Sequence, residues 1–428
     1  MKKLVFILLI NLFPAQQTWT LDESLDYAVK NHPLIKQATV NIQKTDRQIS
    51  AAKGMLLPSV EAGVNHNYSF GSTIDQTTNQ RGSLNTQYDQ VYAQANWELL
   101  NWRNYLAISL SKINKESSVY RLKQAQNEVK LNVISLFFNY QNNKSWLNVL
   151  ETQISGMEDQ IKRTEKEVEI GNRPKSDVYD IKANLGTLQE QWVSAKNSRD
   201  LAKISLLNAL AITDDSLDFK ISNENLSEFN FNDPDFTTDL LEKNPAYRTV
   251  VTEIKAAEKN IGIAKATYLP TLNGLYNWSS FYSKTLGETA DRFSDQFRRN
   301  KSQQVAFGLN IPVFNKFQIK NNVEIAKLNV INYNYEKEIV INNLTQTIKS
   351  IKAQYQNSEE KYTLLQSNFE NQRLSFQKSE EKYKEGLMDA YTFFVVRNNW
   401  LQANYNLISS KNEVLQQTEL LRVLQSEF

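Results

Sequence analysis

Cysteine is absent from this chain of 428 residues, and histidine occurs only twice, as His32 and His66. The lack of cysteine excludes disulfide bonds, thiol nucleophiles, cysteine-ligated metals and the acylated cysteine of a lipoprotein. Two histidines offer little material for a histidine-rich metal site or a Ser-His-Asp triad, and the sequence contains no phosphate-binding loop. We therefore predict that the protein is not an enzyme, uses no cofactor or metal, and holds its histidines in structural or surface positions.

Concentrated charge and long apolar runs are also lacking. A net charge of +2 with no basic patch gives no case for a nucleic-acid partner. The mean hydropathy is −0.52, and no segment beyond the N-terminus approaches the roughly 20 apolar residues that a membrane-spanning helix needs. Any membrane contact must therefore use β-strands or a surface helix.

The N-terminus has the three-part form of a secretory signal peptide. Lys2 and Lys3 precede an apolar run over residues 4–13, and Pro14-Ala15 follows. A short membrane anchor is the alternative, but ten apolar residues are about half of what a spanning helix requires. We expect residues 1–15 to be removed and the mature chain to be exported.

The mature chain contains an internal repeat. At an offset of 212 the matched pairs are Pro33/Pro245, Ile42/Ile254, Ile49/Ile261, Ala52/Ala264, Lys53/Lys265, Leu57/Leu269, Pro58/Pro270 and Asn65/Asn277. At slightly larger offsets Gln90-Val91, Asn96, Asn101 and Gly171 match Gln304-Val305, Asn310, Asn315 and Gly386. Chance similarity between two helical segments would not reproduce both prolines and a distant glycine.

Each half is predicted to form a helix, a strand, a loop, a second strand, a very long helix, a turn and a returning helix. The first helix covers residues 21–57 and stops at Pro58, because proline cannot donate a backbone hydrogen bond and restricts the residue before it. Its repeat partner stops at Pro270. The long helices cover residues 100–170 and 315–385, and the returning helices cover residues 176–212 and 391–428.

The long helices carry apolar stripes with three-four spacing, which is typical of packed helices. About seventy residues at 1.5 Å each give a rod of roughly 105 Å. The second long helix has two neighbouring stripes, which implies neighbours on two sides. The stripes are Ile319, Val323, Ala326, Val330, Tyr333, Val340 and Leu344, and Ile325, Leu328, Ile331, Tyr335 and Ile339.

Four segments alternate apolar and polar residues with period two, as strands with one apolar face do. Their mostly apolar positions are Val60, Ala62, Val64, His66, Tyr68 and Phe70; Val91, Ala93, Ala95 and Trp97; Leu272, Tyr276 and Trp278; and Val305, Phe307, Leu309 and Ile311. A soluble half-buried sheet is the alternative. In an exported chain, strands of about 10 residues with aromatic ends favour a transmembrane β-barrel. The loops at 71–87 and 284–300 are then expected outside the cell.

The two halves, residues 16–212 and 236–428, are joined by a connector over residues 213–235. It is too apolar for a free linker, so we expect it to pack against the helices. Its large apolar residues are Phe219, Ile221, Leu226, Phe229 and Phe231.

Four strands cannot close a barrel, since about eight are needed for a filled interior and more for a channel. Open strand edges in a membrane would leave backbone groups unpaired in lipid at several kcal/mol each. The chain is therefore expected to associate symmetrically.

Short motifs occur in a fixed order in both halves. They are Leu25-Asp26-Tyr27-Ala28 with Asn31-His32-Pro33, Asn244-Pro245, Leu57-Pro58, Leu269-Pro270, Trp97-Glu98-Leu99-Leu100, Ile311-Pro312-Val313-Phe314, Gly171 and Gly386. In this order and spacing the chain resembles the TolC-like outer-membrane efflux family over nearly its whole mature length. The resemblance implies a homotrimer in the outer membrane of a Gram-negative bacterium, with one 12-stranded barrel, a 12-helix tunnel across the periplasm and a tapered entrance.

The same resemblance implies a function and partners. The trimer would be the passive exit duct of a tripartite efflux or type I secretion system, working with a periplasmic adaptor (membrane fusion protein) and an inner-membrane transporter, in contact with outer-membrane lipid. The cargo is not implied, because family members carry drugs, metals or proteins through similar ducts.

The turn after residue 170 resembles the entrance turn of that family, in which acidic residues three apart narrow the pore. Asp177 and Asp180 match those positions, and Arg173, Lys175 and Lys182 could offset their charge. Family gating residues usually lie in the second half, where Asp389 and Glu385 are the further candidates. A simpler interpretation is that Asp177 and Asp180 are helix N-terminal carboxylates favoured by the dipole.

Adaptor docking is implied at the two glycine turns. The candidates are Gly171, Arg173, Gly386 and Leu387, and the alternative is that the glycines only end helices. Pro58, Pro270 and Pro312 are predicted to mark the transitions between helices and strands.

Two other non-enzymatic functions compete with the channel. A periplasmic coiled-coil adaptor would share the long helices but would not contain two copies of paired amphipathic strands. A structural coiled-coil protein of the cell envelope would explain the heptads and leave the strands unexplained.

Overall fold

The computed structural model describes residues 18–74, 79, 81–83, 85–221 and 236–425. The predicted signal peptide, residues 1–15, lies outside the described residues. The chain divides into two compact units. The first comprises Met1–Val40, Tyr120–Arg248 and Ile339–Phe428, and the second comprises Asn41–Val119 and Thr249–Glu338.

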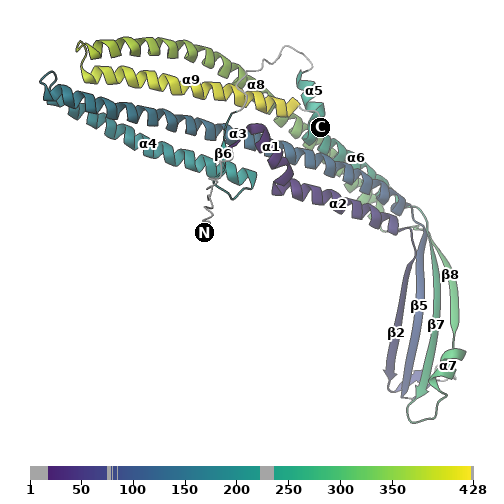
Figure 1. Ribbon diagram of the computed structural model, residues 1–428. Helices are drawn as coiled ribbons and strands as arrows, with labels where there is room; N and C mark the ends of the chain where they lie inside the picture. The colour runs from purple at the N-terminus through teal and green to yellow at the C-terminus, as the bar shows by residue number, and fades with distance from the viewer. Residues whose placement is uncertain (1–17, 75–78, 80, 84, 222–235, 426–428) are drawn as a thin grey trace, which may run out of the picture. The chain divides into compact units, whose positions relative to one another are not determined.

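The elements follow the same order in both halves of the sequence (Figure 1). The helices are α1 (Leu21–Asn31), α2 (Pro33–Gly54), α3 (Trp102–Glu169), α4 (Lys175–Leu210), α5 (Phe236–Lys243), α6 (Pro245–Ala266), α7 (Phe293–Arg299), α8 (Gln318–Lys384) and α9 (Ala390–Gln425). The strands are β1 (Thr18–Trp19), β2 (Ser59–Ser69), β3 (Ser72–Ile74), β4 (Arg81–Ser83), β5 (Thr86–Leu100), β6 (Asp218–Phe219), β7 (Thr271–Thr285) and β8 (Ser302–Asn310). The predicted succession of helix, two strands, very long helix and returning helix is confirmed in each half.

The first unit is held together by side chains buried between helices. One core joins α3, α4, α8 and α9; its buried members are Leu147, Leu150, Met157, Ile161, Ile181, Leu188, Ala195, Tyr383, Phe393 and Phe394. A second core packs α1 and the start of α2 against α3, α4 and α9. The three-four spacing of the apolar residues places them on one side of each helix, which is why the long helices pack in pairs.

The described part of the connector packs on the first unit. Phe219 in β6 is fully buried, and β6 pairs in parallel with β1. Asp218 accepts hydrogen bonds from the Tyr140 hydroxyl (2.6 Å) and the Lys144 ammonium (2.7 Å), both on α3. The connector residues Leu226, Phe229 and Phe231 lie outside the described residues.

The second unit contains an antiparallel sheet in the order β2-β5-β7-β8. The central pair, β5 and β7, joins the two halves of the sequence, and a β-bulge interrupts its register between Glu98 and Leu100. Strands β3 and β4 form a separate small hairpin within the loop between β2 and β5. Within this sheet, β2 and β8 each pair on one side only.

The prediction of one helix over residues 21–57 was wrong in its middle and at its end. His32 adopts an extended conformation (φ −62°, ψ 132°) because Pro33 follows it, so α1 ends at Asn31 and α2 begins at Pro33. Helix α2 then ends at Gly54 and α6 ends at Ala266, in each case four residues before the proline. Pro58 and Pro270 directly precede β2 and β7, whereas Pro312 follows β8 on the way to α8.

The predicted loop at residues 284–300 contains a helix, α7. Phe293 and Phe297 lie on one side of α7 and contact Tyr282 and Trp278 of β7, with ring centroids 5.4 and 6.2 Å apart. Gln296, 8% exposed, exchanges two 3.0 Å hydrogen bonds with the Ser283 backbone. These contacts cover the edge of β7 beyond the end of β8, and a tertiary contact of this kind leaves little trace in a short loop sequence.

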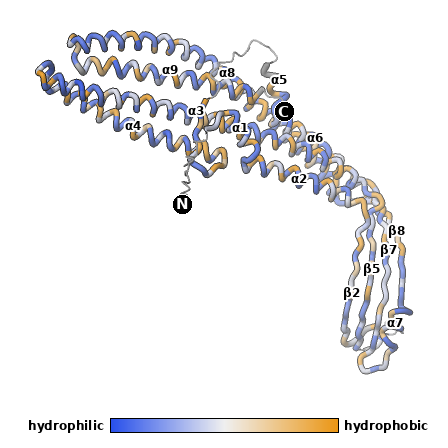
Figure 2. Tube along the Cα trace, viewed as in Figure 1, coloured by the Kyte–Doolittle hydropathy of each residue, from blue (hydrophilic) through white to orange (hydrophobic). Residues whose placement is uncertain are grey.

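Hydrophobic and hydrophilic residues are interspersed along the helices (Figure 2). Among the described residues, no helix combines the length and the apolar character needed to cross a membrane.

Candidate functional site

The turns that connect α3 to α4 and α8 to α9 share one backbone geometry. The amides of Gly171 and Asn172 donate to carbonyls in the last turn of α3, and those of Gly386 and Leu387 do the same in α8, over 2.8 to 3.1 Å. Both glycines are left-handed, with φ of +81° and +77°, a conformation that a side chain would strain. The two turns are therefore Schellman motifs, and both glycines end their helices.

Arg173 in the first turn reaches the second hairpin. Its guanidinium donates to the backbone carbonyl of Tyr383 on α8 (2.8 Å) and lies 4.1 Å from the centroid of the Tyr383 ring. On its own hairpin, Nε lies 2.5 Å from Glu167 Oε2 and Nη1 lies 3.3 Å from Asp177 Oδ2. The Arg173 side chain is only 11% exposed. We call Arg173, Tyr383, Glu167 and Asp177 together the Arg173 brace.

Electrostatics keep the brace charged. Burial disfavours the guanidinium ion, but the interactions with Tyr383, Asp177 and Glu167 outweigh burial and raise the pKa of Arg173 above its ordinary value. Two carboxylates thus neutralise one arginine that is largely removed from water.

Tyr383 is the centre of the packing around the brace. Its side chain is buried and stacks on Phe393 of α9, with centroids 4.5 Å apart and planes 12° from parallel. Its hydroxyl lies 3.2 Å from Gln160 Nε2 and 3.4 Å from Thr164 Oγ1, both on α3. Tyr383 was not predicted from the sequence, and the one signal for it was its place one turn before Gly386.

Asp177 and Asp180, the first pair of gate candidates, have different environments. Asp177 is 15% exposed and belongs to the Arg173 brace. Asp180 lies in the next turn of α4 and is exposed. Lys182, which we expected to offset their charge, is instead paired with Glu165 over 2.8 Å.

Asp389 and Glu385, the second pair, flank the other turn. The Asp389 carboxylate accepts from the backbone amide (2.8 Å) and the hydroxyl (2.7 Å) of Thr392, so it caps the start of α9. These hydrogen bonds lower the pKa of Asp389. Glu385 is exposed, and so is the docking candidate Leu387, with 74% of its surface accessible. Arg173, whose side chain is 11% exposed, is therefore less accessible than the other docking candidates.

A second arginine, which the sequence analysis missed, also joins the hairpins. Arg397 of α9 donates to the Gln153 carbonyl of α3 over 3.2 Å. Burial lowers its pKa, and its guanidinium lies against Gly156, where an added methyl group would collide with it. Gly156 therefore provides the space that the Arg397 guanidinium occupies.

The sheet of the second unit has an exposed apolar face. Residues that pair directly across strands share a face, and the rows Val64–Val91–Ser280 and Val60–Ala95–Tyr276–Val305 all lie on this one. Val60, Val64, Val305 and Phe307 are 66 to 74% exposed. Side chains of this kind are normally buried against a second layer.

The length of the apolar face matches a membrane. Along β7 it runs from Leu272 to Ser280, which at about 3.3 Å per residue is roughly 26 Å. The outward apolar band of transmembrane strands is about 25 Å tall. The next row ends the band with polar groups, because the His66 imidazole and the Asp89 carboxylate are in contact across the strands there.

Comparisons with known proteins agree with this geometry. The model of the outer membrane efflux protein family matches residues 25–211 and 237–425, which are the two repeats. Outer membrane protein TolC of Escherichia coli is 22% identical over 364 residues, covering 82% of this chain and 71% of TolC. The probable efflux pump outer membrane protein TtgC of Pseudomonas putida is 19% identical over 413 residues, covering 93% of this chain and 82% of TtgC.

Solved structures show the same fold. The CmeC outer membrane channel of Campylobacter jejuni superposes with a TM-score of 0.73 at 18% identity, covering 95% of this chain and 87% of CmeC. The family match spans both repeats, strands included, which neither an adaptor nor a structural coiled coil would explain. The chain therefore belongs to the outer membrane efflux protein family and is an efflux channel of the Gram-negative outer membrane.

Proposed function

We propose that three copies of this chain close into one duct, which receives substrates from an inner-membrane transporter through a periplasmic adaptor and releases them outside the cell. The observation that carries the proposal is the sheet, which combines an apolar outer face with strands β2 and β8 that pair on one side only. In lipid such edges would cost several kcal/mol for each unpaired backbone group. Pairing β8 of one copy with β2 of the next removes every edge.

The number of copies follows from the size of the interior. Two copies would supply eight strands, whose interior is just filled by side chains, so three is the smallest number that leaves a channel. Cyclic symmetry then gives each copy the same contacts. The family resemblance supports the same number.

Exposed apolar stripes on the helices support contacts between copies. On α8, one predicted stripe is buried in part, at Ile319, Val323 and Ala326. The neighbouring stripe is 50 to 63% exposed, and its members are Ile325, Leu328, Ile331, Tyr335 and Ile339. We propose that this second stripe packs against the next copy.

At the entrance, the Arg173 brace holds the two hairpins of one copy together, so widening the entrance requires the guanidinium to leave Tyr383. Asp177 acts as a member of the brace, while Asp180, Asp389 and Glu385 remain the candidates that can face the axis. The adaptor would dock on the exposed surface of the turns around Gly171, Gly386 and Leu387. TtgC is described as part of an efflux pump, and we propose the same kind of partnership here.

Cysteine labelling on intact cells tests the orientation without background, because the chain has no cysteine of its own. Glu288→Cys, in the loop after β7, should react with an impermeant maleimide, and Lys175→Cys, at the start of α4, should react only after the outer membrane is permeabilised. The trimer itself should migrate as one heat-sensitive oligomer after mild extraction and form channels in planar bilayers. Labelling of Lys175→Cys alone, or a monomer without conductance, would contradict the proposal.

A further inference from the structure

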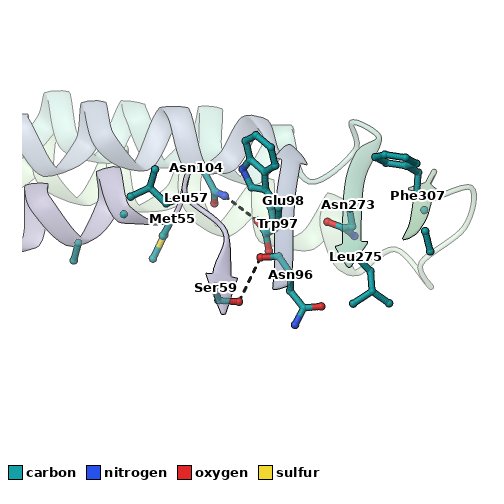
Figure 3. A pocket seen from close by; sticks show the side chains of 15 residues that line it. Met55, Leu57, Ser59, Asn96, Trp97, Glu98, Asn104, Asn273, Leu275 and Phe307 are labelled. Atoms are coloured by element: carbon teal, nitrogen blue, oxygen red, sulfur yellow. Dashed lines mark hydrogen bonds between the residues drawn. The ribbon is translucent and has the colours of Figure 1, made fainter. Parts of the chain in front are cut away.

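The second unit contains a hollow of about 960 Å³ where the strands meet the helices (Figure 3). Its walls come from the end of α2, the start of α3 and the ends of β5, β7 and β8. Met55, Leu57 and Leu275 supply apolar surface, while Asn96, Glu98 and Asn273 supply polar groups. The hollow therefore combines apolar walls with a carboxylate.

Glu98 is held in a defined position within this hollow. The side-chain amides of Asn101 (2.9 Å) and Asn104 (2.8 Å) both donate to its Oε2 atom, and the bond from Asn104 is visible in Figure 3. Asn104 is itself buried at the start of α3. Two donors on one oxygen fix the carboxylate and leave Oε1 for another partner, since an ionised carboxylate accepts at both oxygens.

The charges on this face of the sheet have one sign. Glu98 lies in register with Asn273 and Gly308, on the face opposite the apolar one. Farther along the same face Glu61 is in register with Gln94, which lies in register with Asn277. On this face of the four described strands, the charged residues are these two glutamates, and lysine and arginine do not occur. Lys284 points to the other face.

We propose that Glu98, presented by Asn101 and Asn104, is a binding site for amphipathic organic cations that pass through the duct. The inference rests on the proposed function, because this face becomes the inner wall only when copies close the sheet. Each copy then contributes one site at the level where the helices meet the strands. The carboxylate attracts the positive charge in a confined space, and the walls at Met55, Leu57 and Leu275 contact the apolar part of the ligand.

Ion-block measurements on the assembled channel test the site. Purified wild-type protein in planar bilayers is titrated with tetraphenylphosphonium as the cation and with tetraphenylborate as an anion of the same shape. Glu98→Gln keeps the shape of the side chain and removes its charge, so the half-blocking concentration of the cation should rise about five-fold or more. The anion should block no more weakly than before.

Three further variants separate binding from general electrostatics. Glu61→Gln removes an equal charge outside the hollow, so it should lower the preference for potassium over chloride while changing cation block less than about two-fold. Asn101→Ala keeps the Glu98 carboxylate but removes one of the two hydrogen bonds that hold it in place. This variant should weaken cation block less than Glu98→Gln does. Glu98→Asp, which keeps the charge and shortens its reach, should fall between wild type and Glu98→Gln.

The outcomes are distinguishable. Equal weakening of cation block by Glu98→Gln and Glu61→Gln, or equal block by cation and anion in the wild type, would overturn the binding site and leave the duct intact. Unchanged block in Glu98→Gln channels of normal conductance would do the same. Absence of any channel in the wild type would overturn the proposed function, and with it this inference.

Discussion

The sheet and the hairpin turns are built in opposite ways. In the sheet the large side chains of the apolar face are exposed, and on the other face Asn96, Glu98 and Asn273 line a hollow. Near the turns the large side chain of Tyr383 is buried, and the charges of the Arg173 brace are paired around it. The turns bury a large side chain and pair their charges, as a protein in water does. The sheet instead exposes its large apolar side chains.

This difference identifies the medium that each region requires. Exposed Val, Phe and Leu side chains over roughly 26 Å are stable only where the surroundings are themselves apolar. A buried arginine with two carboxylates is stable only where its partners stay in place, since leaving one buried charge unpaired costs several kcal/mol. Substitutions should therefore act through lipid contact in the sheet and through packing at the turns.

The largest expected effect is at Tyr383. Tyr383→Ala removes a buried aromatic ring that contacts α3, α9 and Arg173, and such truncations cost about 3–5 kcal/mol. Tyr383→Phe is the matched control, because it keeps the stack on Phe393 and loses only the hydroxyl contacts. Thermal unfolding of the purified oligomer should show a large decrease for the first variant and a small one for the second. Similar decreases would mean that the hydroxyl, and not the ring, holds the hairpins.

The next effect is on the sheet. Val64→Arg places a charge on the apolar face, where an arginine costs about 2–4 kcal/mol at the bilayer midplane. Asn65→Arg adds the same charge to the other face and should be tolerated better. The amount of assembled oligomer recovered from outer membranes measures the difference. Equal recovery would indicate that water, not lipid, covers the apolar face.

A smaller effect is expected at Gly156. Gly156→Val would collide with the Arg397 guanidinium, and overpacking of this kind costs about 1–3 kcal/mol. Gly186→Val on α4 is the control, because nothing lies within 4 Å of a Cβ atom added there. Both variants place a β-branched residue in a helix, so the difference in their melting temperatures reports the collision alone. No difference would show that the arginine moves away at little cost.

The sequence was sufficient to predict the elements that depend on local conformation or on the periodic spacing of apolar residues. The long helices, the four strands and the glycine turns follow from three-four spacing, period-two alternation and the left-handed conformation at Gly171 and Gly386. The break between α1 and α2 at His32 was not predicted, because the helical spacing of apolar residues continues through it. Pro33 was the available signal, since proline restricts the residue before it. Contacts between distant residues left no sequence signal. Arg173 and Tyr383 are 210 residues apart, and Arg397 and Gln153 are 244 apart.

The sequence predicted which residues lie at the two turns, but not what each of them contacts. The resemblance to the family's entrance turn selected Asp177 and Asp180 as a pair, but Asp177 joins the Arg173 brace and Asp180 is exposed. That outcome depends on the hairpin formed by the second half of the chain. Asp389 was selected as a gate candidate, and its capping of α9 could have been expected from its place three residues before Thr392 at a helix start.

The smallest expected effect concerns that cap and separates its charge from its hydrogen bonds. Because the pKa of Asp389 is lowered in the folded protein, its contribution is complete above the ordinary carboxylate pKa of about 4. The contribution is lost as the pH falls through the lowered value, since protonation removes the negative charge and turns one of the two accepting oxygens of Asp389 into a hydroxyl donor. Asp389→Asn should keep the cap, because asparagine is as good a capping residue as aspartate, but should remove its dependence on pH. Hydrogen exchange in the first turn of α9 would then accelerate between neutral pH and about pH 3 in the wild type, after correction for the intrinsic rate, and not in the variant. Glu385→Gln, on the other side of the turn, should behave as the wild type does. If wild type and Asp389→Asn show the same acceleration, protonation elsewhere in the turn opens α9, and the charge of Asp389 makes no contribution to the cap.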